Sequence, residues 1–226
     1  MADFVLPPPS TPSVPTIDGR LFPVRRILCV GRNYAAHRRE MGSDERTPPF
    51  FFGKPADAVA TDGAVLAYPS ATSELHHEVE LVAALGRGGV AVTESEALDL
   101  VFGYAVGVDL TRRDLQNGAK ARSEPWESAK AFDASAPIGA IRPWRGTPPQ
   151  GRICLAVNGQ VRQDALIAEM IWSVAEVIRE ASRLWRLEPG DLIFTGTPAG
   201  VGPLERGETV SCEIEEVGTL RFSIAE

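Results

Sequence analysis

Two glutamates stand out within an otherwise apolar stretch, His-His-Glu-Val-Glu-Leu-Val-Ala-Ala-Leu, at residues 76–85. Alternate side chains of a β-strand share a face, so Glu78 and Glu80 would point the same way. Two carboxylates side by side on an apolar strand repel each other and are costly to desolvate, and a divalent cation removes both problems. The spacing therefore indicates a metal site, with a solvated face of a sheet as the alternative.

A third acid, Asp109, ends a second apolar run that begins at Phe102. Ala105 and Gly107 share its expected strand face, and their small size leaves room there for something bulky. Three carboxylates from two neighbouring strands, without a thiolate, favour an octahedral oxygen site for Mg²⁺ or Mn²⁺. The alternative is that Asp109 is only a turn residue that ends its strand.

The chain has three histidines and three lysines, so their positions are informative. His37 and Glu40 would meet on one face of a helix, where the carboxylate would raise the basicity of the imidazole, as a general base needs. An exposed ion pair is the alternative for these two. Lys130 lies in a weakly polar setting, and an ammonium near a metal could stabilise an enolate or oxyanion. His76 and His77 adjoin the acidic pair and could hydrogen-bond a metal ligand or simply lie at the surface.

Apolar periodicity predicts many strands and few helices. Expected strands cover 26–30, 64–68, 78–85, 102–109, 153–157, 160–163 and 191–195, with two more in the tail. Asn158 and Gly159 predict a type I′ hairpin turn. Helices are expected over 93–100 and 170–184, and capping boxes at 93–96 and 111–114. Because strands and helices do not alternate regularly, the pattern predicts a strand-rich α+β fold rather than a doubly wound sheet.

Length and composition exclude several classes of protein. The chain has 226 residues, of which 44% are hydrophobic and 23% are charged, with a net charge of −7. Without a basic run or an apolar stretch of about 20 residues, we expect no nucleic-acid and no membrane partner. The three cysteines are widely spaced and predict neither a disulfide framework nor a zinc site. We expect a proline-rich arm over 1–22, a single domain over 23–226 and, without a signal peptide, a cytoplasmic location.

Six segments in order along the chain together resemble the fumarylacetoacetate hydrolase family. They are residues 30–37, 52–55, 77–81, 107–116, 129–132 and 194–202. The short length and the run from Pro48 to Pro55 are most similar to the fumarylpyruvate hydrolase and acylpyruvase branch. The resemblance implies a mixed β-sandwich roll of the type of that family's C-terminal domain. It also implies one divalent cation per chain, Mg²⁺ or Mn²⁺, and a homodimer.

The same resemblance implies roles for individual residues. It makes Glu78, Glu80 and Asp109 the metal ligands. It makes His37 and Glu40 the pair that activates water and Lys130 the group that stabilises the leaving enolate. Residues expected to contact the substrate or its charge are Arg113, Gln116, Thr197, Arg32 and Lys54, with Arg122 a further candidate for the distal carboxylate.

The expected function is that of a metal-dependent hydrolase that cleaves the C–C bond of a 2,4-dioxo acid in aromatic-compound catabolism. Its small-molecule substrate would be fumarylpyruvate, giving fumarate and pyruvate, or a related acylpyruvate. Oxaloacetate decarboxylation and isomerisation of a 2-hydroxy-diene-dioate use the same metal and enolate chemistry and remain alternatives. A non-catalytic binding module braced by a metal is a more distant one.

Overall fold

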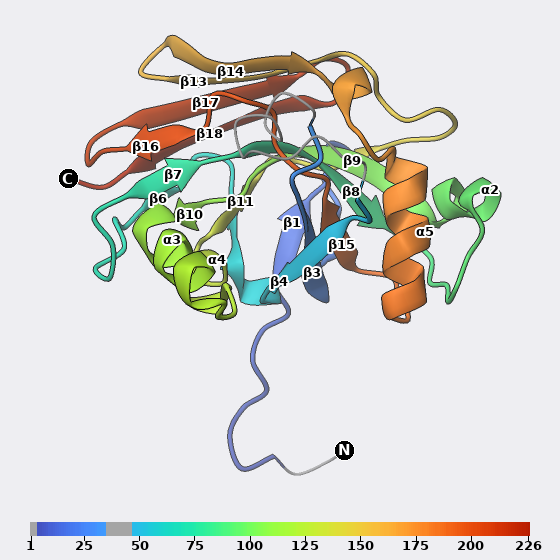
Figure 1. Ribbon diagram of the computed structural model, residues 1–226. Coiled ribbons are helices and arrows are strands. Elements are labelled where there is room, and N and C mark those ends of the chain that lie inside the picture. The colour runs from blue at the N-terminus through green and yellow to red at the C-terminus, as the bar shows by residue number, and fades with distance from the viewer. Residues whose placement is uncertain (1–3, 35–46) are drawn as a thin grey trace.

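A computed structural model describes residues 4–34 and 47–226, and its centre is a large mixed sheet (Figure 1). Within the described residues this sheet has eight strands, seven of them in the order β4-β3-β15-β8-β9-β11-β5, with β12 paired to β9. Their bounds are Phe50–Lys54, Arg26–Gly31, Asp191–Phe194, Val79–Leu85, Val101–Val108, Ala136–Ile138 and Val59–Thr61, and Arg142–Pro143 for β12. All seven residues of β8 are buried, which explains why every residue of this strand except Glu80 is apolar.

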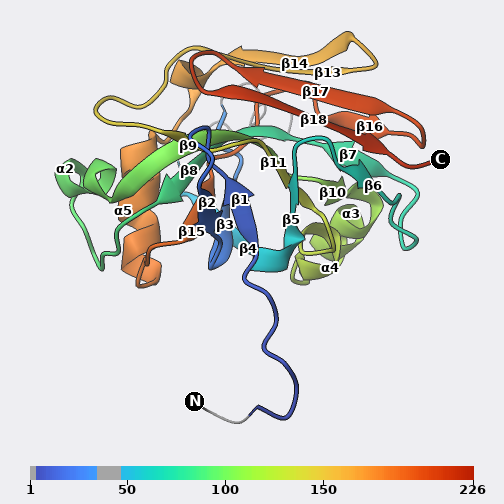
Figure 2. The same cartoon turned by 180° about the vertical axis from the view of Figure 1, so that it is seen from behind.

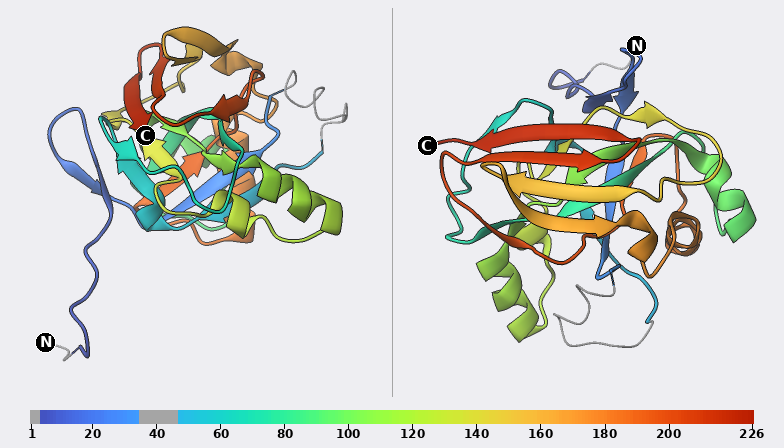
Figure 3. Two further views of the ribbon diagram at one scale, coloured as in Figure 1. Left: turned by 90° about the vertical axis from the view of Figure 1, so that its left-hand side faces the viewer. Right: turned by 90° about the horizontal axis from the view of Figure 1, so that it is seen from above.

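A second sheet packs over one face of the first, and its strands lie side by side in the right-hand view of Figure 3. Its described order is β14-β13-β17-β18-β6, with bounds Gln160–Leu166, Arg152–Val157, Thr209–Ile214, Gly218–Ile224 and Val65–Leu66. On β17 the buried residues alternate with polar ones, because one face meets the core and the other meets water. The main core therefore lies between the two sheets.

The opposite face of the large sheet is covered by a small hairpin of β1, Ser13–Pro15, and β2, Leu21–Pro23 (Figure 2). Its Val14 and Phe22 are buried against Val82, Ala84 and other residues of a second apolar cluster. Covering both faces of the sheet keeps water away from the strands that carry the acidic residues.

A three-stranded sheet of order β10-β7-β16 and several short helices complete the described fold. The strands are Thr111–Arg112, Leu75–His77 and Gly202–Leu204. The α-helices are α2 (Glu94–Ala97), α3 (Arg113–Arg122), α4 (Glu127–Lys130) and α5 (Val174–Leu184), and the 3₁₀ turns are η1 (Ala56–Ala58), η2 (Leu98–Leu100) and η3 (Ile167–Glu169). Helices α3 and α4 pack together at one end of the large sheet, away from α5 (Figure 1). No helix among residues 4–34 and 47–226 is long and apolar enough to span a membrane.

The strand-rich α+β architecture agrees with the prediction, and so do several local details. Asn158 and Gly159 both have positive φ, at 49° and 79°, as a type I′ turn requires. The capping box between Thr93 and Glu96 is present.

Three expectations about element boundaries were wrong. Helix α5 begins only at Val174, because Ser173 and Glu176 form a capping box that fixes its start after Met170 and Ile171. Of the strand expected over 64–68, only Val65–Leu66 pairs. No capping box forms at 111–114, since Thr111 belongs to β10 and the Asp114 carboxylate bonds Thr72 and Ser73 of a preceding loop.

Candidate active site

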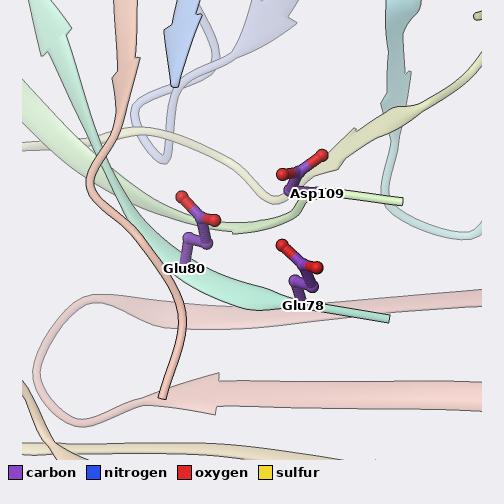
Figure 4. Close-up of side chains that lie close together, drawn as sticks. All are labelled: Glu78, Glu80 and Asp109. Carbon is purple, nitrogen blue, oxygen red and sulfur yellow. The ribbon is translucent and has the colours of Figure 1, made fainter. Parts of the chain in front are cut away.

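Glu78, Glu80 and Asp109 form a buried acidic triad, in which one carboxylate oxygen from each residue lies within 4.8 Å of the others (Figure 4). The three residues are 6%, 1% and 0% exposed. Strands β8 and β9 pair antiparallel in register, with Val79 opposite Val108, and the Asp109 amide donates to the Glu78 carbonyl at 2.8 Å. Strand pairing therefore brings together residues that are about thirty positions apart in the sequence.

Glu80 is the member of the triad with the least compensation of its charge. Its Oε2 accepts one hydrogen bond, at 2.7 Å from the Gly196 amide, and no described cation lies within ion-pair distance of it. Burial, followed by the charges of Asp109 and Glu78, raises the pKa of this carboxyl well above its usual range. A buried oxygen-only cluster with an uncompensated carboxylate fits a hard divalent cation.

Two lysines contact the other two acids. The Lys130 Nζ donates to Glu78 Oε2 at 2.9 Å, to Thr111 Oγ1 at 2.6 Å and to Asp109 Oδ2. Although burial lowers the pKa of Lys130, the charges of Asp109 and Glu78 outweigh it and the net shift is upward, so the ammonium stays charged. The Lys54 Nζ lies 2.8 Å from Asp109 Oδ1 and donates to the Leu110 carbonyl.

A cleft opens from the triad toward solvent. Its lining is Val30, Gly31, Arg32, Phe52, Glu78, Glu80, Arg113, Gln116, Lys120, Trp126, Lys130 and Thr197. The Arg113 guanidinium bridges the Glu78 carboxylate and the Gln116 amide oxygen, and both arginine and glutamine come from the first turn of α3. One side of the cleft is therefore acidic and buried, and the other is cationic.

Gln163 supports the cleft from the second sheet, although it does not line it. Its buried side-chain oxygen contacts His77 Nδ1 at 2.9 Å and accepts from the Val79 amide at 3.0 Å. Its nitrogen donates to Thr197 Oγ1 at 2.8 Å and to the Pro198 carbonyl. Sequence reasoning missed this residue, because only the folded β14 strand places it beside partners at least 34 positions away.

The glycine-rich segment 196–202 holds Glu80 of the acidic triad in place. Gly196 has φ +98°, and a Cβ there would lie 2.6 Å from the Asn33 Cβ, so only glycine allows its amide to reach Glu80. Buried Asn33 fixes this approach by donating to the carbonyls of Thr195 and Trp172. Thr197, in the same segment, is 3% exposed and lines the cleft.

The structure brings most of the predicted site residues together and changes the surroundings of several. Arg32, Arg113, Gln116, Lys130 and Thr197 line the cleft. Lys54 is instead 3% exposed and does not line the cleft. The space expected beside Gly107 is filled, since a Cβ there would lie 2.5 Å from Val82 and 2.6 Å from Phe194.

Three histidines were singled out in the sequence, and the structure describes two of them. His77 is buried against Gln163, and burial lowers its pKa. His76 Nδ1 accepts from Arg113 Nε at 3.4 Å, and burial lowers the pKa of this imidazole to about 4, so it is neutral at pH 7. His37 and Glu40 lie outside the described residues.

Residues 26–225 match the fumarylacetoacetate (FAA) hydrolase C-terminal family, so the chain belongs to this family of enzymes. A crystal structure of fumarylpyruvate hydrolase from Pseudomonas aeruginosa, in complex with Mn²⁺ and pyruvate, is 49% identical to it. The two superpose with a TM-score of 0.96 over 99% of each chain. The Mn²⁺ of that complex and the acidic triad together support a divalent cation in this site.

Curated relatives with two different activities are about equally similar to the chain. Fumarylpyruvate hydrolase of Ralstonia sp. is 40% identical over 77% of this chain and 92% of its own length. The mitochondrial oxaloacetate tautomerase FAHD1 of Mus musculus is 42% identical over 88% of this chain and 91% of its own. The compounds in both names, fumarylpyruvate and oxaloacetate, are α-keto acids.

Proposed function

We propose that the chain is a divalent-metal-dependent hydrolase that cleaves the C–C bond of a 2,4-dioxo acid. Fumarylpyruvate would give fumarate and pyruvate, or a related acylpyruvate its acid and pyruvate, in aromatic-compound catabolism. The observation that carries this proposal is the buried triad with the Lys130 ammonium 2.9 Å from Glu78, at the inner end of a cleft with cationic walls. The similarity to a fumarylpyruvate hydrolase that binds Mn²⁺ and pyruvate supports it.

The proposed cation is Mg²⁺ or Mn²⁺, one per chain, held by Glu78, Glu80 and Asp109. When bound, it would supply Lewis-acid chemistry, withdrawing charge from the α-keto acid and making pyruvate enolate a better leaving group. The pairing of β8 with β9 would hold the three carboxylates in place around that cation.

The chain's own residues would carry the remaining steps. His37, oriented by Glu40, would take a proton from water, and the resulting hydroxide would attack the distal keto carbon. The C–C bond then breaks, its electron pair passes to the pyruvate fragment, and a proton completes the methyl group. The Lys130 ammonium would stabilise the enolate charge, while Arg113, Gln116 and Thr197 hold the substrate.

Oxaloacetate tautomerisation is the second candidate, because the mouse tautomerase is 42% identical to this chain. Proton movement between carbon and oxygen needs the same enolate stabilisation but no attacking water. Decarboxylation of oxaloacetate and isomerisation of a diene-dioate remain further alternatives of the same kind.

A substrate panel separates these functions. The metal-loaded protein is incubated with fumarylpyruvate, acetylpyruvate and oxaloacetate. The loss of enol absorbance and the release of pyruvate and of carbon dioxide are measured. We expect stoichiometric pyruvate and fumarate, abolished by chelator and restored by Mg²⁺ or Mn²⁺. Loss of enol absorbance from oxaloacetate without pyruvate, with both dioxo acids untouched, would overturn the hydrolase proposal in favour of the tautomerase.

Assembly and location are separate expectations. Residues 4–12, the first described part of the expected arm, extend away from the body (left view of Figure 3). Phe4, Val5 and Leu6 in this part are 65%, 100% and 75% exposed, and a homodimer would cover such apolar surface. The molar mass from light scattering tests it. The cytoplasmic location stays a prediction.

A further inference from the structure

Lys120 lies on the outer wall of the cleft, in the last turn of α3, and the sequence patterns predicted no role for this residue. Its ammonium lies 5.1 Å from the centre of the Trp126 ring, which begins α4. An aromatic face attracts a cation but does not neutralise its charge. Packing of α3 against α4 therefore fixes a charged group at the cleft wall.

The charge on Lys120 has no acidic counterpart among residues 4–34 and 47–226. No described aspartate or glutamate lies within ion-pair distance of it, although the first-turn Arg113 on the same helix is paired with Glu78. Arg32 and Arg113, which also line the cleft, are both cationic, and burial together with their charges lowers the pKa of Lys120 to about 8. A group that is destabilised in this way gains from an anion brought by a ligand.

Arg32 adds a second cation beside this wall, and its backbone is unusual. It has φ 61°, in the left-handed region that residues with a side chain rarely adopt, and it follows Gly31 at the end of β3. Its side chain is exposed and makes no ion pair with a described residue. A strained backbone that directs an unpaired cation into a cleft is a feature of ligand-binding sites.

The same wall carries flat apolar surface. Trp126 packs edge-on against Phe50, with ring centres 4.9 Å apart, and lies 6.1 Å from Phe52. Phe52 in turn lies 5.0 Å from the Lys130 ammonium, at the inner end of the cleft. Aromatic rings thus connect the acidic end of the cleft with Lys120, and they suit a flat, conjugated chain.

We propose that Lys120, assisted by Arg32, binds a carboxylate at the far end of the substrate, while Trp126 and Phe52 pack against an unsaturated chain that leads to it. This assignment rests on the proposed function and narrows it, because it selects dioxo acids with a second, distal carboxylate over acylpyruvates that end in a methyl group. The two other cations considered for this role are not available. Lys54 is paired with Asp109, and Arg122 lies exposed beside Glu124 at 2.8 Å.

Two substrates that differ only at the distal end test the proposal. The first is fumarylpyruvate, and the second is the same dioxo acid with methyl in place of the distal carboxylate. Both are assayed with the metal-loaded wild type, Lys120→Met, Lys120→Arg and the matched control Arg122→Gln, which removes an exposed cation from the same helix. Calorimetric binding of both compounds is measured in parallel.

We expect Lys120→Met to lower the preference for the dicarboxylate, as a ratio of kcat/KM values, by about tenfold, as loss of one charge-assisted contact would. Lys120→Arg should restore most of the preference, and Arg122→Gln should keep it. An unchanged ratio in Lys120→Met, or an equal loss in Arg122→Gln, would overturn the proposal. If the wild type hydrolyses neither compound, the hydrolase proposal fails, and the binding ratio still decides the role of Lys120.

Discussion

At the acidic triad, Lys130 and Lys54 are buried and each contacts a carboxylate, whereas on the outer wall of the cleft Lys120 is half-buried beside a tryptophan ring. Lys54 ends strand β4 and Lys130 ends the short helix α4, while Lys120 lies in the last turn of α3. The same residue type therefore serves two purposes. Inside, it balances fixed charges of the protein, and outside, it is left for a charge that the ligand brings.

The names of the relatives bear on what this difference could serve. Relatives named as fumarylpyruvate hydrolase and as oxaloacetate tautomerase are similarly close to the chain, and both names refer to an α-keto acid. Under the proposed function, the inner end of the cleft binds the α-keto acid and the outer wall binds the distal part of the substrate. The predictions below test this division, beginning with the inner end.

The largest effect is expected for Glu80→Gln, which removes the carboxylate with the least compensated charge. We expect loss of metal binding and a fall in kcat/KM of more than about 100-fold. Loss of a residue that only orients a metal ligand typically costs up to about 100-fold, and loss of a ligand itself should cost more. Without metal, the variant should be at least as stable as the wild type, because one of three buried like charges is gone.

Metal content and urea unfolding of the metal-free protein measure these two effects. Glu213→Gln is the matched control, since Glu213 is exposed on the outer face of the second sheet. A Glu80→Gln protein that retains full metal affinity would remove Glu80 from the proposed ligand set.

A smaller effect is expected for Gln163→Leu, which leaves His77, the Val79 amide and the Thr197 hydroxyl without their buried partner. Unfolding free energy should fall by about 1–3 kcal/mol, and kcat/KM by about tenfold. Gln160→Leu, at the exposed start of the same strand, is the control.

A double-mutant cycle with Thr197→Val shows whether the loss of activity comes through the threonine. If Gln163 acts by holding that hydroxyl, the two effects on kcat/KM will be far from additive. Additive effects would mean that Gln163 supports only the fold.

The smallest expected effect is a change of KM with pH, caused by Lys120 on the outer wall of the cleft. Because burial and the charges of Arg113 and Arg32 lower the pKa of Lys120 to about 8, its ammonium loses its proton as the pH rises through that value. Glu78 acts in the opposite direction and Lys130 in the same direction as the arginines. We expect KM for the dicarboxylic substrate to rise by about threefold to tenfold between about pH 7 and pH 9, since only the charged form attracts an anion.

The neutral analogue serves as the reference in that titration, because its KM does not depend on a distal charge. Lys120→Arg should flatten the profile, as a guanidinium stays protonated throughout. An identical pH profile for both substrates would place the titrating group at the inner end and contradict the comparison drawn above.

Local sequence patterns predicted the parts of the site that depend on strand geometry. Glu78 and Glu80 are two residues apart, and this spacing alone places them on one face. Asp109 joins them because β8 and β9 pair, which two apolar runs close in sequence made a reasonable expectation.

The parts that depend on packing between distant segments were not predictable in this way. Lys54 looked like a cation for the substrate, but pairing of β4 with β3 buries it beside Asp109. The small Gly107 suggested free space, yet the side chains of Val82 and Phe194 fill that space and leave no room for a Cβ at this position. The role of Lys120 depends on the packing of helix α4 beside it, and the role of Gln163 depends on the second sheet. No spacing within the sequence predicts either arrangement.

The position of α3 and α4 at the end of the large sheet has a consequence for how such an enzyme could change its substrates. Most of the outer wall belongs to a loop and to helices α3 and α4, while the three acids and Lys130, the last residue of α4, are buried. Replacement of Lys120, which makes no ion pair with a described residue, would cost little folding energy, so evolution or a protein engineer could change the accepted distal group and leave the bond-breaking residues unchanged.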